Sequence, residues 1–399
     1  MDKNKRLTVW LPVIIAASIA LGIFIGNHYL SISQGKKRSY SSGNKINAIL
    51  DIIDEQYVDT VSMSKLVEST IPKIFSELDP HSVYIPAEDA SVVNEELEGS
   101  FSGIGVSFNM QTDTILVISV ISGGPAEKAG LLPFDRIISI NDSIFSGKKK
   151  NQGEIMKTLR GAKNSTVKLG VQRGNSPELL YFDVTRGDVP VNSVDVSYEA
   201  AKGIGYIKVS KFARNTYNEF ITAIAKLKQA GCTSFVIDLR GNTGGYMDAA
   251  INMINEFMPE GRLIVYTEGK SFPRSWVYAN GTGTCKDAPI VVLTDEISAS
   301  ASEIFSGAIQ DNDRGTIIGR RTYGKGLVQT QMSLSDGSEM RLTIARYYTP
   351  SGRCIQKKYE MGNTDAYDQD IYNRYMHGEF DSADSIKMDD SLKYQTVGG

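Results

Sequence analysis

The chain has 399 residues, enough for two or three domains, and its 41% hydrophobic and 22% charged residues are ordinary for a globular protein. Its net charge is −3 with basic and acidic residues well mixed, which excludes the basic surface typical of nucleic-acid binding. Three cysteines are too few for a disulfide framework or a zinc cluster, and three histidines make a Ser-His-Asp triad implausible. We therefore expect no metal, no other cofactor and no nucleic-acid partner, and any hydrolytic chemistry needs a base other than histidine.

The N-terminus has the pattern of a membrane anchor over residues 1–30. Lys3, Lys5 and Arg6 precede an uncharged stretch, residues 7–26, which at helical rise is about 30 Å long and can span a bilayer. A cleaved signal peptide is the alternative, but no clear small-x-small site follows the stretch. The sequence favours a single transmembrane helix with the remaining chain outside the cytoplasm, although the basic cluster at 36–38 opposes this orientation.

Two segments of different character follow this stretch. Residues 31–44 are polar and rich in serine and glycine, as in a linker. From residue 45 to 78 apolar residues recur with helical period, and Asp79-Pro80 interrupts the pattern. We predict a small N-terminal helical region over residues 45–97.

Residues 98–188 predict a compact β-rich domain. Five short segments of alternating hydrophobicity are separated by Gly, Pro, Asn and Asp, and two helical stretches occur near 125–129 and 152–159. The domain begins with a glycine loop, Gly103-Ile104-Gly105-Val106. Free N–H groups in such a loop can hold the terminal carboxylate of a peptide, while the adjacent strand edge pairs with the rest of it.

Strands and helices alternate over residues 189–358. Buried strands are expected at 204–209, 234–239, 290–295 and 316–319, with helices between them and a hairpin at Asp336-Gly337. Such alternation predicts an α/β layer structure with right-handed crossovers. Residues 359–399 are polar and weakly patterned, and we predict a polar tail there.

Ser300 lies between a buried strand that ends at Asp295 and a predicted helix. Side chains at such a strand–turn–helix junction face the carboxyl edge of the sheet, where α/β folds bind ligands. Ser300 to Glu303 also fits the capping-box pattern S-x-x-E, so the serine could simply cap its helix. This segment alone favours the cap over a nucleophile.

Lys325 stands between Gly324 and Gly326, just before a strand. A lysine flanked by glycines is normally a surface turn. In a crowded pocket, however, burial would disfavour its charged form and lower its pKa, which would make it a usable general base.

A third motif, Gly241-Asn242-Thr243-Gly244-Gly245, connects a buried strand to a helix. Glycines at a helix start let backbone N–H groups converge on an anion. The motif lacks the Gly-Lys-Ser/Thr ending of a nucleotide-binding loop, which argues against phosphate binding. An oxyanion hole completed by the Ala301 amide, or a simple tight turn, are the two remaining interpretations.

Together these segments resemble the C-terminal processing peptidases, or tail-specific proteases, of the Ser-Lys S41 class. The resemblance covers about residues 45–356 and rests on five motifs in order: YVD…LDPHSVYIP, GSFSGIGVSF, DLRGNTGG, SASASEIFSGAIQDN and TYGKGLVQ. It implies a protease core of the crotonase/Clp-protease type at 189–358. It also implies an inserted PDZ domain at 98–188 that captures substrate C-termini, and a location at the periplasmic face of a bacterial cell envelope.

The resemblance also assigns roles to single residues. It implies that Ser300 is the nucleophile, that Lys325 is the base, and that Gln329 orients the lysine. Oxyanion donors would come from the glycines of GNTGG, Gly244 in the first place and Gly245 beside it, and from the amide of Ala301. The implied partners are protein or peptide substrates, bound through their C-termini, while a homo-oligomer or an activating partner is left open.

Two departures from the family pattern matter. The usual Gly-Asp of the PDZ domain reads Phe134-Asp135, which we expect to alter only a turn. The closing segment with a G-I-x-P-D-like motif does not follow Y-Y-T-P-S-G-R, so a truncated core without its last strand is one expectation. Two other functions stay open: a non-catalytic PDZ adaptor on a degenerate or truncated protease scaffold, and a crotonase-like acyl-thioester enzyme.

Overall fold

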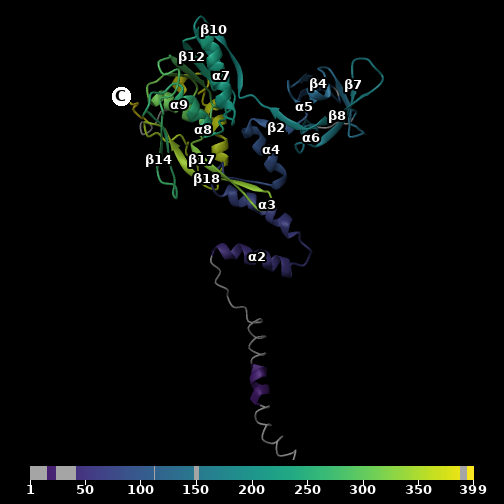
Figure 1. Ribbon diagram of the computed structural model, residues 1–399. Coiled ribbons are helices and arrows are strands. Elements are labelled where there is room, and N and C mark those ends of the chain that lie inside the picture. Colours follow the sequence, from purple (N-terminus) through teal and green to yellow (C-terminus); the bar gives the residue numbers. More distant parts are fainter. Residues whose placement is uncertain (1–15, 24–41, 112, 148–151, 387–392) are drawn as a thin grey trace, which may run out of the picture. The chain divides into compact units, whose positions relative to one another are not determined.

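The computed structural model describes residues 16–23, 42–111, 113–147, 152–386 and 393–399 (Figure 1). The chain forms two compact units, residues 1–70 and 71–399. Helices α2 (Ser42–Gln56) and α3 (Met63–Ser76) lie where the helical period predicts them. Most of the stretch predicted to be a membrane anchor lies outside the described residues, and its described part, residues 16–23, is helical. None of the helices in these described ranges has the length and apolarity needed to cross a membrane.

The predicted β-rich domain is an antiparallel sheet in the order β3-β4-β5-β7-β8. Alternating apolar residues form its core, so that Val117, Ile137 and Leu169 are fully buried. Its strands and helices are β3 (Val106–Gln111), β4 (Thr114–Val120), α5 (Pro125–Ala129), β5 (Arg136–Ile140), β6 (Ser143–Ile144), α6 (Gln152–Leu159), β7 (Thr166–Gln172) and β8 (Leu180–Thr185). A short ladder of β2 (Ser100–Gly103) and β9 (Gly187–Pro190) lies where the chain enters and leaves this sheet.

The unusual Phe134 lies in a turn of this domain, as predicted. Its φ is +68°, a region that normally requires glycine, and its side chain is 74% exposed. The neighbouring Asp135 is buried and accepts two hydrogen bonds of 2.8 Å from Arg173. The backbone of this turn therefore has the conformation that glycine favours, although the residue is phenylalanine.

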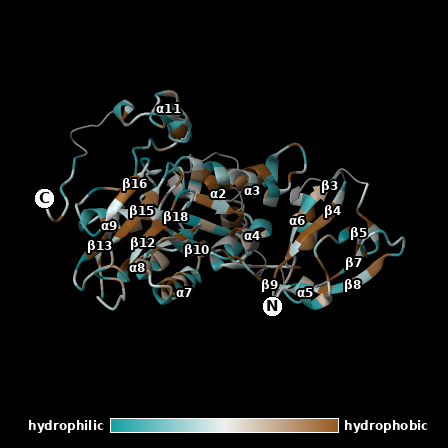
Figure 2. Ribbon diagram, turned by 90° about the horizontal axis from the view of Figure 1, so that it is seen from above, coloured by the Kyte–Doolittle hydropathy of each residue, from teal (hydrophilic) through white to brown (hydrophobic). Residues whose placement is uncertain are grey.

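The core of the larger unit contains a five-stranded sheet in the order β10-β11-β12-β15-β16, parallel from β11 to β16. Its hydrophobic strands appear brown in Figure 2. Its elements are β10 (Val194–Ala201), β11 (Ile204–Val209), α7 (Thr216–Gln229), β12 (Ser234–Asp238), α8 (Met247–Asn255), β15 (Ile290–Thr294), α9 (Ala301–Asp311) and β16 (Thr316–Gly319). Because β12 and β15 are parallel neighbours, the turns that follow them meet at one edge.

A second sheet has the order β1-β18-β13-β14, and β17 pairs with β18. Its strands are β1 (Val83–Ile85), β13 (Leu263–Glu268), β14 (Ser275–Tyr278), β17 (Leu327–Ser333) and β18 (Glu339–Tyr348), and α4 (Ala87–Glu98) follows β1. The predicted hairpin is confirmed, with Gly337 at φ +88° between β17 and β18. The sequence analysis missed β1, β13 and β14, because these short strands carry no clear period-2 pattern.

The segment predicted to be a polar tail is partly folded. It contains α10 (Asp365–Asp368), α11 (Asp370–Met376) and a 3₁₀ turn (Ala383–Ser385). Tyr367 is only 3% exposed and Arg374 only 4% exposed. A polar segment can be ordered in this way when a few of its side chains are buried against a neighbouring loop.

Candidate active site

The turn that carries Ser300 runs from the end of β15 to the first residue of α9. Ser300 has φ +54° and ψ −111°, whereas an ordinary N-cap residue lies in the β region. Its N–H donates to the Glu303 carboxylate at 2.8 Å, as the capping-box pattern predicts. Capping alone does not require a positive φ on a serine, and such strained residues cluster at active sites. The serine therefore occupies the cap position in a conformation that a cap does not need.

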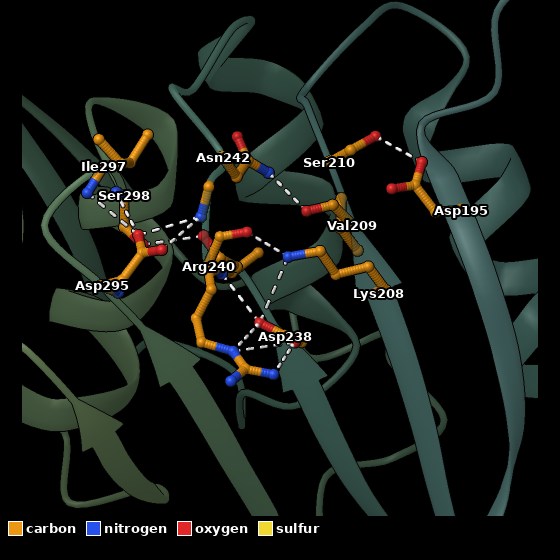
Figure 3. Close-up of polar contacts among 12 residues, drawn as sticks. Asp195, Lys208, Val209, Ser210, Asp238, Arg240, Asn242, Asp295, Ile297 and Ser298 are labelled. Carbon is orange, nitrogen blue, oxygen red and sulfur yellow. Dashed lines mark hydrogen bonds and ion pairs between the residues drawn. The ribbon is translucent and has the colours of Figure 1, made fainter.

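One carboxylate ties this turn to the turn that follows β12 (Figure 3). Both oxygens of Asp295 accept from Gly241 N–H, at 2.9 and 3.0 Å, and one also accepts from the amides of Ile297 and Ser298 at 3.0 Å. Ser298 Oγ donates to the carbonyl of Leu239 at 2.8 Å. Each of the two turns thus donates a hydrogen bond to the other.

Asn242 is fully buried and adds a second set of bonds between these turns. Its side chain donates to the carbonyl of Val209 at 3.0 Å, and its own carbonyl accepts from Ala299 N–H at 3.0 Å. Ser302 Oγ donates to the same carbonyl at 2.9 Å. Asn242 therefore holds the GNTGG loop directly against the residues on either side of Ser300.

Asp238, at the end of β12, holds the start of the GNTGG loop (Figure 3). It is 1% exposed and accepts hydrogen bonds from the Arg240 guanidinium, the shortest 2.7 Å, and from the Tyr206 hydroxyl at 2.6 Å. Burial alone would raise the pKa of Asp238, but these donors outweigh it and lower the pKa to about 2. The carboxylate is therefore ionised at neutral pH and holds Arg240 in place.

Gly244 lies in contact with the nucleophile turn. Its φ is +102°, and a Cβ there would lie 2.8 Å from Ser300 Cβ and 3.1 Å from Ala301 N. The predicted oxyanion residues and Ser300 are thus brought together. Gly244 N–H itself donates to Asn242 Oδ1 at 2.8 Å, whereas no hydrogen bond from Gly245 N–H or Ala301 N–H is found within the described ranges. Gly245 and Ala301 are therefore the available donors of the predicted set.

The loop that carries Lys325, residues 321–326, is neither helix nor strand. The buried carboxylate of Glu303 accepts four hydrogen bonds: from Gly324 N–H at 2.6 Å, Thr322 Oγ1 at 2.7 Å, and Lys325 N–H and Ser300 N–H at 2.8 Å each. The amides of Lys325 and Ser300 donate to the same Glu303 oxygen, so these two nitrogens lie at most twice 2.8 Å apart. Burial raises the pKa of Glu303, and the donors oppose this rise. A single side chain thus joins the backbones of Ser300 and Lys325.

The Lys325 side chain is partly buried. Burial lowers the pKa of its amine, as does the positive charge of Arg341, while Asp79 and Glu303 oppose this shift. We find no hydrogen bond or ion pair of Lys325 Nζ among the residues that the structure describes. These conditions favour the neutral amine that a general base requires.

Gln329 makes a different contact from the predicted one. Its side-chain amide donates to the backbone carbonyl of His81, and within the described chain no hydrogen bond joins it to Lys325. The segment it holds is anchored by Asp79, whose carboxylate accepts from the amides of His81 and Ser82 at 3.0 Å and from Thr343 Oγ1 at 2.9 Å. Gln329 therefore supports the Asp79–Ser82 segment in this conformation.

His81 is a site residue to which the sequence analysis gave no role. Its Nε2 lies 2.8 Å from the Tyr367 hydroxyl, and its pKa is lowered to about 4, mainly by burial, against the effect of Asp79. The ring is therefore neutral at physiological pH. The LDPHSVYIP motif contained the signal for Asp79 and His81, but nothing in the polar tail distinguished Tyr367.

The predicted peptide-binding loop connects β2 to β3. The carbonyl of Ile104 accepts from Ala126 N–H at 2.7 Å, and that of Gly105 accepts from Ile121 N–H at 3.0 Å. Gly105 has φ +77°. Val106 begins β3, which pairs only with β4 among the described strands. The other edge of β3 can accept a peptide strand, which fits the predicted role.

Comparison with known proteins places these features in a family. The model of peptidase family S41 matches residues 203–365, and the PDZ domain model matches residues 102–195. The carboxy-terminal processing protease CtpB of Bacillus subtilis is 35% identical over 318 residues, which are 79% of this chain and 66% of that protein. A CtpA-like serine protease of Staphylococcus aureus is 33% identical over 365 residues, or 90% of this chain and 72% of that protein.

A solved structure, that of a photosystem II D1 C-terminal processing protease, is 28% identical with a TM-score of 0.45 and covers 79% of this chain and 91% of that one. From the two bacterial relatives and the family models, the chain belongs to peptidase family S41, the carboxy-terminal processing serine proteases, and it contains a PDZ domain.

Proposed function

We propose that this chain hydrolyses proteins near their C-termini by acyl transfer, with Ser300 as nucleophile and Lys325 as base. The main support is the Glu303 carboxylate, which holds the backbones of both residues through one oxygen. Neutral Lys325 Nζ takes the hydroxyl proton while Ser300 Oγ attacks the scissile carbonyl. The amides of Ala301 and Gly245 stabilise the oxyanion, and the lysine then protonates the leaving amine before water releases the acyl group.

The PDZ domain would present the substrate to this site. We propose that the loop from Gly103 to Val106 holds the terminal carboxylate and that the free edge of β3 pairs with the preceding residues. A substrate whose C-terminus is amidated loses the carboxylate and should be cleaved more slowly.

The test is turnover of a peptide with an apolar C-terminus by the full chain, compared with Ser300→Ala and Lys325→Ala. Ser306→Ala is the matched control, because Ser306 Oγ donates to the helix carbonyl of Ser302 at 2.9 Å. We expect both site variants to lose turnover and the control to keep it. Unchanged turnover in Ser300→Ala would refute the assignment, and wild-type chain that binds the peptide without cleaving it would favour the PDZ adaptor.

We further propose that the N-terminal stretch, residues 7–26, anchors the chain in a bacterial membrane with its catalytic part outside the cytoplasm. The support is its length, its lack of charge and the three basic residues before it. Alkaline extraction of membranes should leave the chain in the pellet, and added protease should degrade it in spheroplasts with intact membranes. Release of the chain by alkaline carbonate would contradict the anchor.

A further inference from the structure

The loop that carries Lys325 has no secondary structure, yet most of its backbone polar groups are hydrogen-bonded. The amides of Gly324 and Lys325 donate to Glu303, and the amide of Tyr323 donates to the carbonyl of Ser298 at 3.0 Å. The acceptors of all three bonds lie in the turn that carries Ser300 or in helix α9. These bonds therefore hold only the side of the loop that faces the nucleophile.

The other side of the loop is held by the segment that follows β18, residues 356–379. Gln356 Oε1 accepts from Gly326 N–H at 2.9 Å, and the amide of Lys357 donates to the carbonyl of Gly324 at 2.9 Å. The Lys357 ammonium lies over the rings of Tyr323 and Tyr367, 4.3 and 4.0 Å from their centroids. The segment therefore contacts both the backbone and a side chain of the loop.

Arg374 makes the most extensive of these contacts. It is almost fully buried, and its guanidinium donates to the carbonyls of Thr322 at 3.2 Å and Arg321 at 2.5 Å. Its third contact is an ion pair of 2.9 Å with Glu379, which also accepts two hydrogen bonds from Arg321. Only the planar guanidinium has the fork geometry to reach two consecutive carbonyls and a carboxylate at once.

We propose that Arg374 is a positioning residue for the catalytic base, and that the segment 356–379 clamps the Lys325 loop against Glu303. This inference rests on the proposed role of Lys325 in hydrolysis. It gives a function to a segment whose sequence carries no motif. Without the clamp the loop would keep only its contacts with the nucleophile side, and the amine would move toward water.

The clamp should be visible in the protonation of Lys325. The charged or titratable groups around this amine are Glu303 on α9, Arg341 on β18, and Asp79 and His81 before β1. Arg374 instead donates to the carbonyls of Arg321 and Thr322, so it acts on the amine by placing the loop. Greater exposure to water reduces the desolvation that lowers the lysine pKa, so the pKa should rise when Arg374 is lost.

The experiment compares Arg374→Met with Arg314→Met in the full chain. Arg314 is the control: it is partly buried and also donates to three backbone carbonyls, those of Phe257, Cys285 and Ala288 at 2.6–2.9 Å, none of which belongs to the Lys325 loop. Two readouts are measured: the pH dependence of kcat/KM, and the pH dependence of Lys325 acetylation by acetic anhydride, followed by peptide mass spectrometry. The second readout needs no turnover, because it reports the neutral amine directly.

For Arg374→Met we expect the rising limb of both profiles to move about one unit toward higher pH. We also expect kcat at pH 7 to fall on the order of 10- to 100-fold, as for a misplaced catalytic group. Arg314→Met should keep the wild-type limb even if its thermal stability falls. Arg374→Lys keeps the positive charge opposite Glu379, and its rising limb should lie between those of the wild type and Arg374→Met. This variant tests the proposal if Arg374→Met does not fold.

An acetylation limb in Arg374→Met or Arg374→Lys that coincides with the wild type would overturn the clamp. If acetylation shifts as expected but the wild-type chain shows no Ser300-dependent turnover, the proposed function fails while the clamp stands. The two hypotheses can therefore fail separately.

Discussion

The turn that carries Ser300 and the loop that carries Lys325 are held in different ways. The first lies between β15 and α9, and most of its bonds run to the neighbouring turn of the same parallel sheet, through Asp295 and Asn242. The second has no regular structure and depends on Glu303 and Arg374, which lie before and after it in the chain. Sheet topology thus places the nucleophile, whereas side chains of other segments place the base. Loss of one such side chain should displace the base more readily than the nucleophile.

The largest effect is expected where the two regions meet, at Glu303. In Glu303→Gln one oxygen becomes an NH₂ group that faces donors, and each donor left without an acceptor costs about 1–3 kcal/mol. We expect the free energy of unfolding to fall and kcat to drop on the order of 10²- to 10³-fold. Urea unfolding and turnover are the measurements, with Glu268→Gln as the control at a surface ion pair. Wild-type kcat in Glu303→Gln would show that the shared carboxylate does not organise the site.

Gly244→Ala tests the nucleophile side alone. Its methyl group would lie 2.7 Å from the Ala299 carbonyl and 2.8 Å from Ser300 Cβ, on a backbone at φ +102°. We expect kcat to fall about 10²-fold because the serine is pushed from its position. Gly231→Ala is the control: it has φ +93° and nothing within 4 Å of its Cβ, so it should lose only about 1–2 kcal/mol of stability. Equal kcat in the two variants would contradict the packing of Gly244 against Ser300.

The same difference explains what the sequence could predict. The parallel strands, the GNTGG turn and the Ser300 junction follow from apolar runs and glycines that are local in the chain. The Arg374 contacts could not be predicted, because no period or motif marks a polar segment whose few buried side chains bond to backbone carbonyls. Gln329 was assigned by resemblance to orient Lys325, but the contact it makes, with the His81 carbonyl, depends on β1 pairing with β18 across the chain.

A smaller effect is expected at the base side from Tyr367→Phe. The change removes the hydroxyl that lies 2.8 Å from His81 Nε2 and leaves the buried ring packed against His81 and Tyr323. The hydroxyl also accepts from Gln356 Nε2 at 3.3 Å. Loss of the shorter bond, to His81, costs about 0.5–1.5 kcal/mol, so kcat should fall by roughly two- to tenfold. Tyr372→Phe, on the exposed face of α11, is the control. A Tyr367→Phe enzyme as active as this control would show that the hydroxyl is not needed to place His81.

The last prediction concerns stability rather than rate, and it tests whether water reaches the pocket beside Lys325. The folded chain binds a proton on His81 only near pH 4, whereas the unfolded chain binds it near the ordinary value of about 6.5. Between these values the unfolded state binds more protons, so stability falls as the pH falls from 6.5 toward 4. The free energy of unfolding of His81→Gln should therefore decline less steeply over this range than that of the wild type. The exposed His377→Gln variant is the control, and its curve should follow the wild type.

Parallel curves for His81→Gln and the wild type would mean that His81 gains its proton equally easily in both states, and hence that water reaches the ring. Burial is the first cause both of the low pKa of His81 and of the lowered pKa of Lys325. If water reaches the His81 ring, the Lys325 amine is less desolvated as well, and its neutral form is less favoured at pH 7. A steep wild-type curve that flattens in His81→Gln, in contrast, would place the imidazole in a water-poor environment beside the base, where a neutral lysine is favoured.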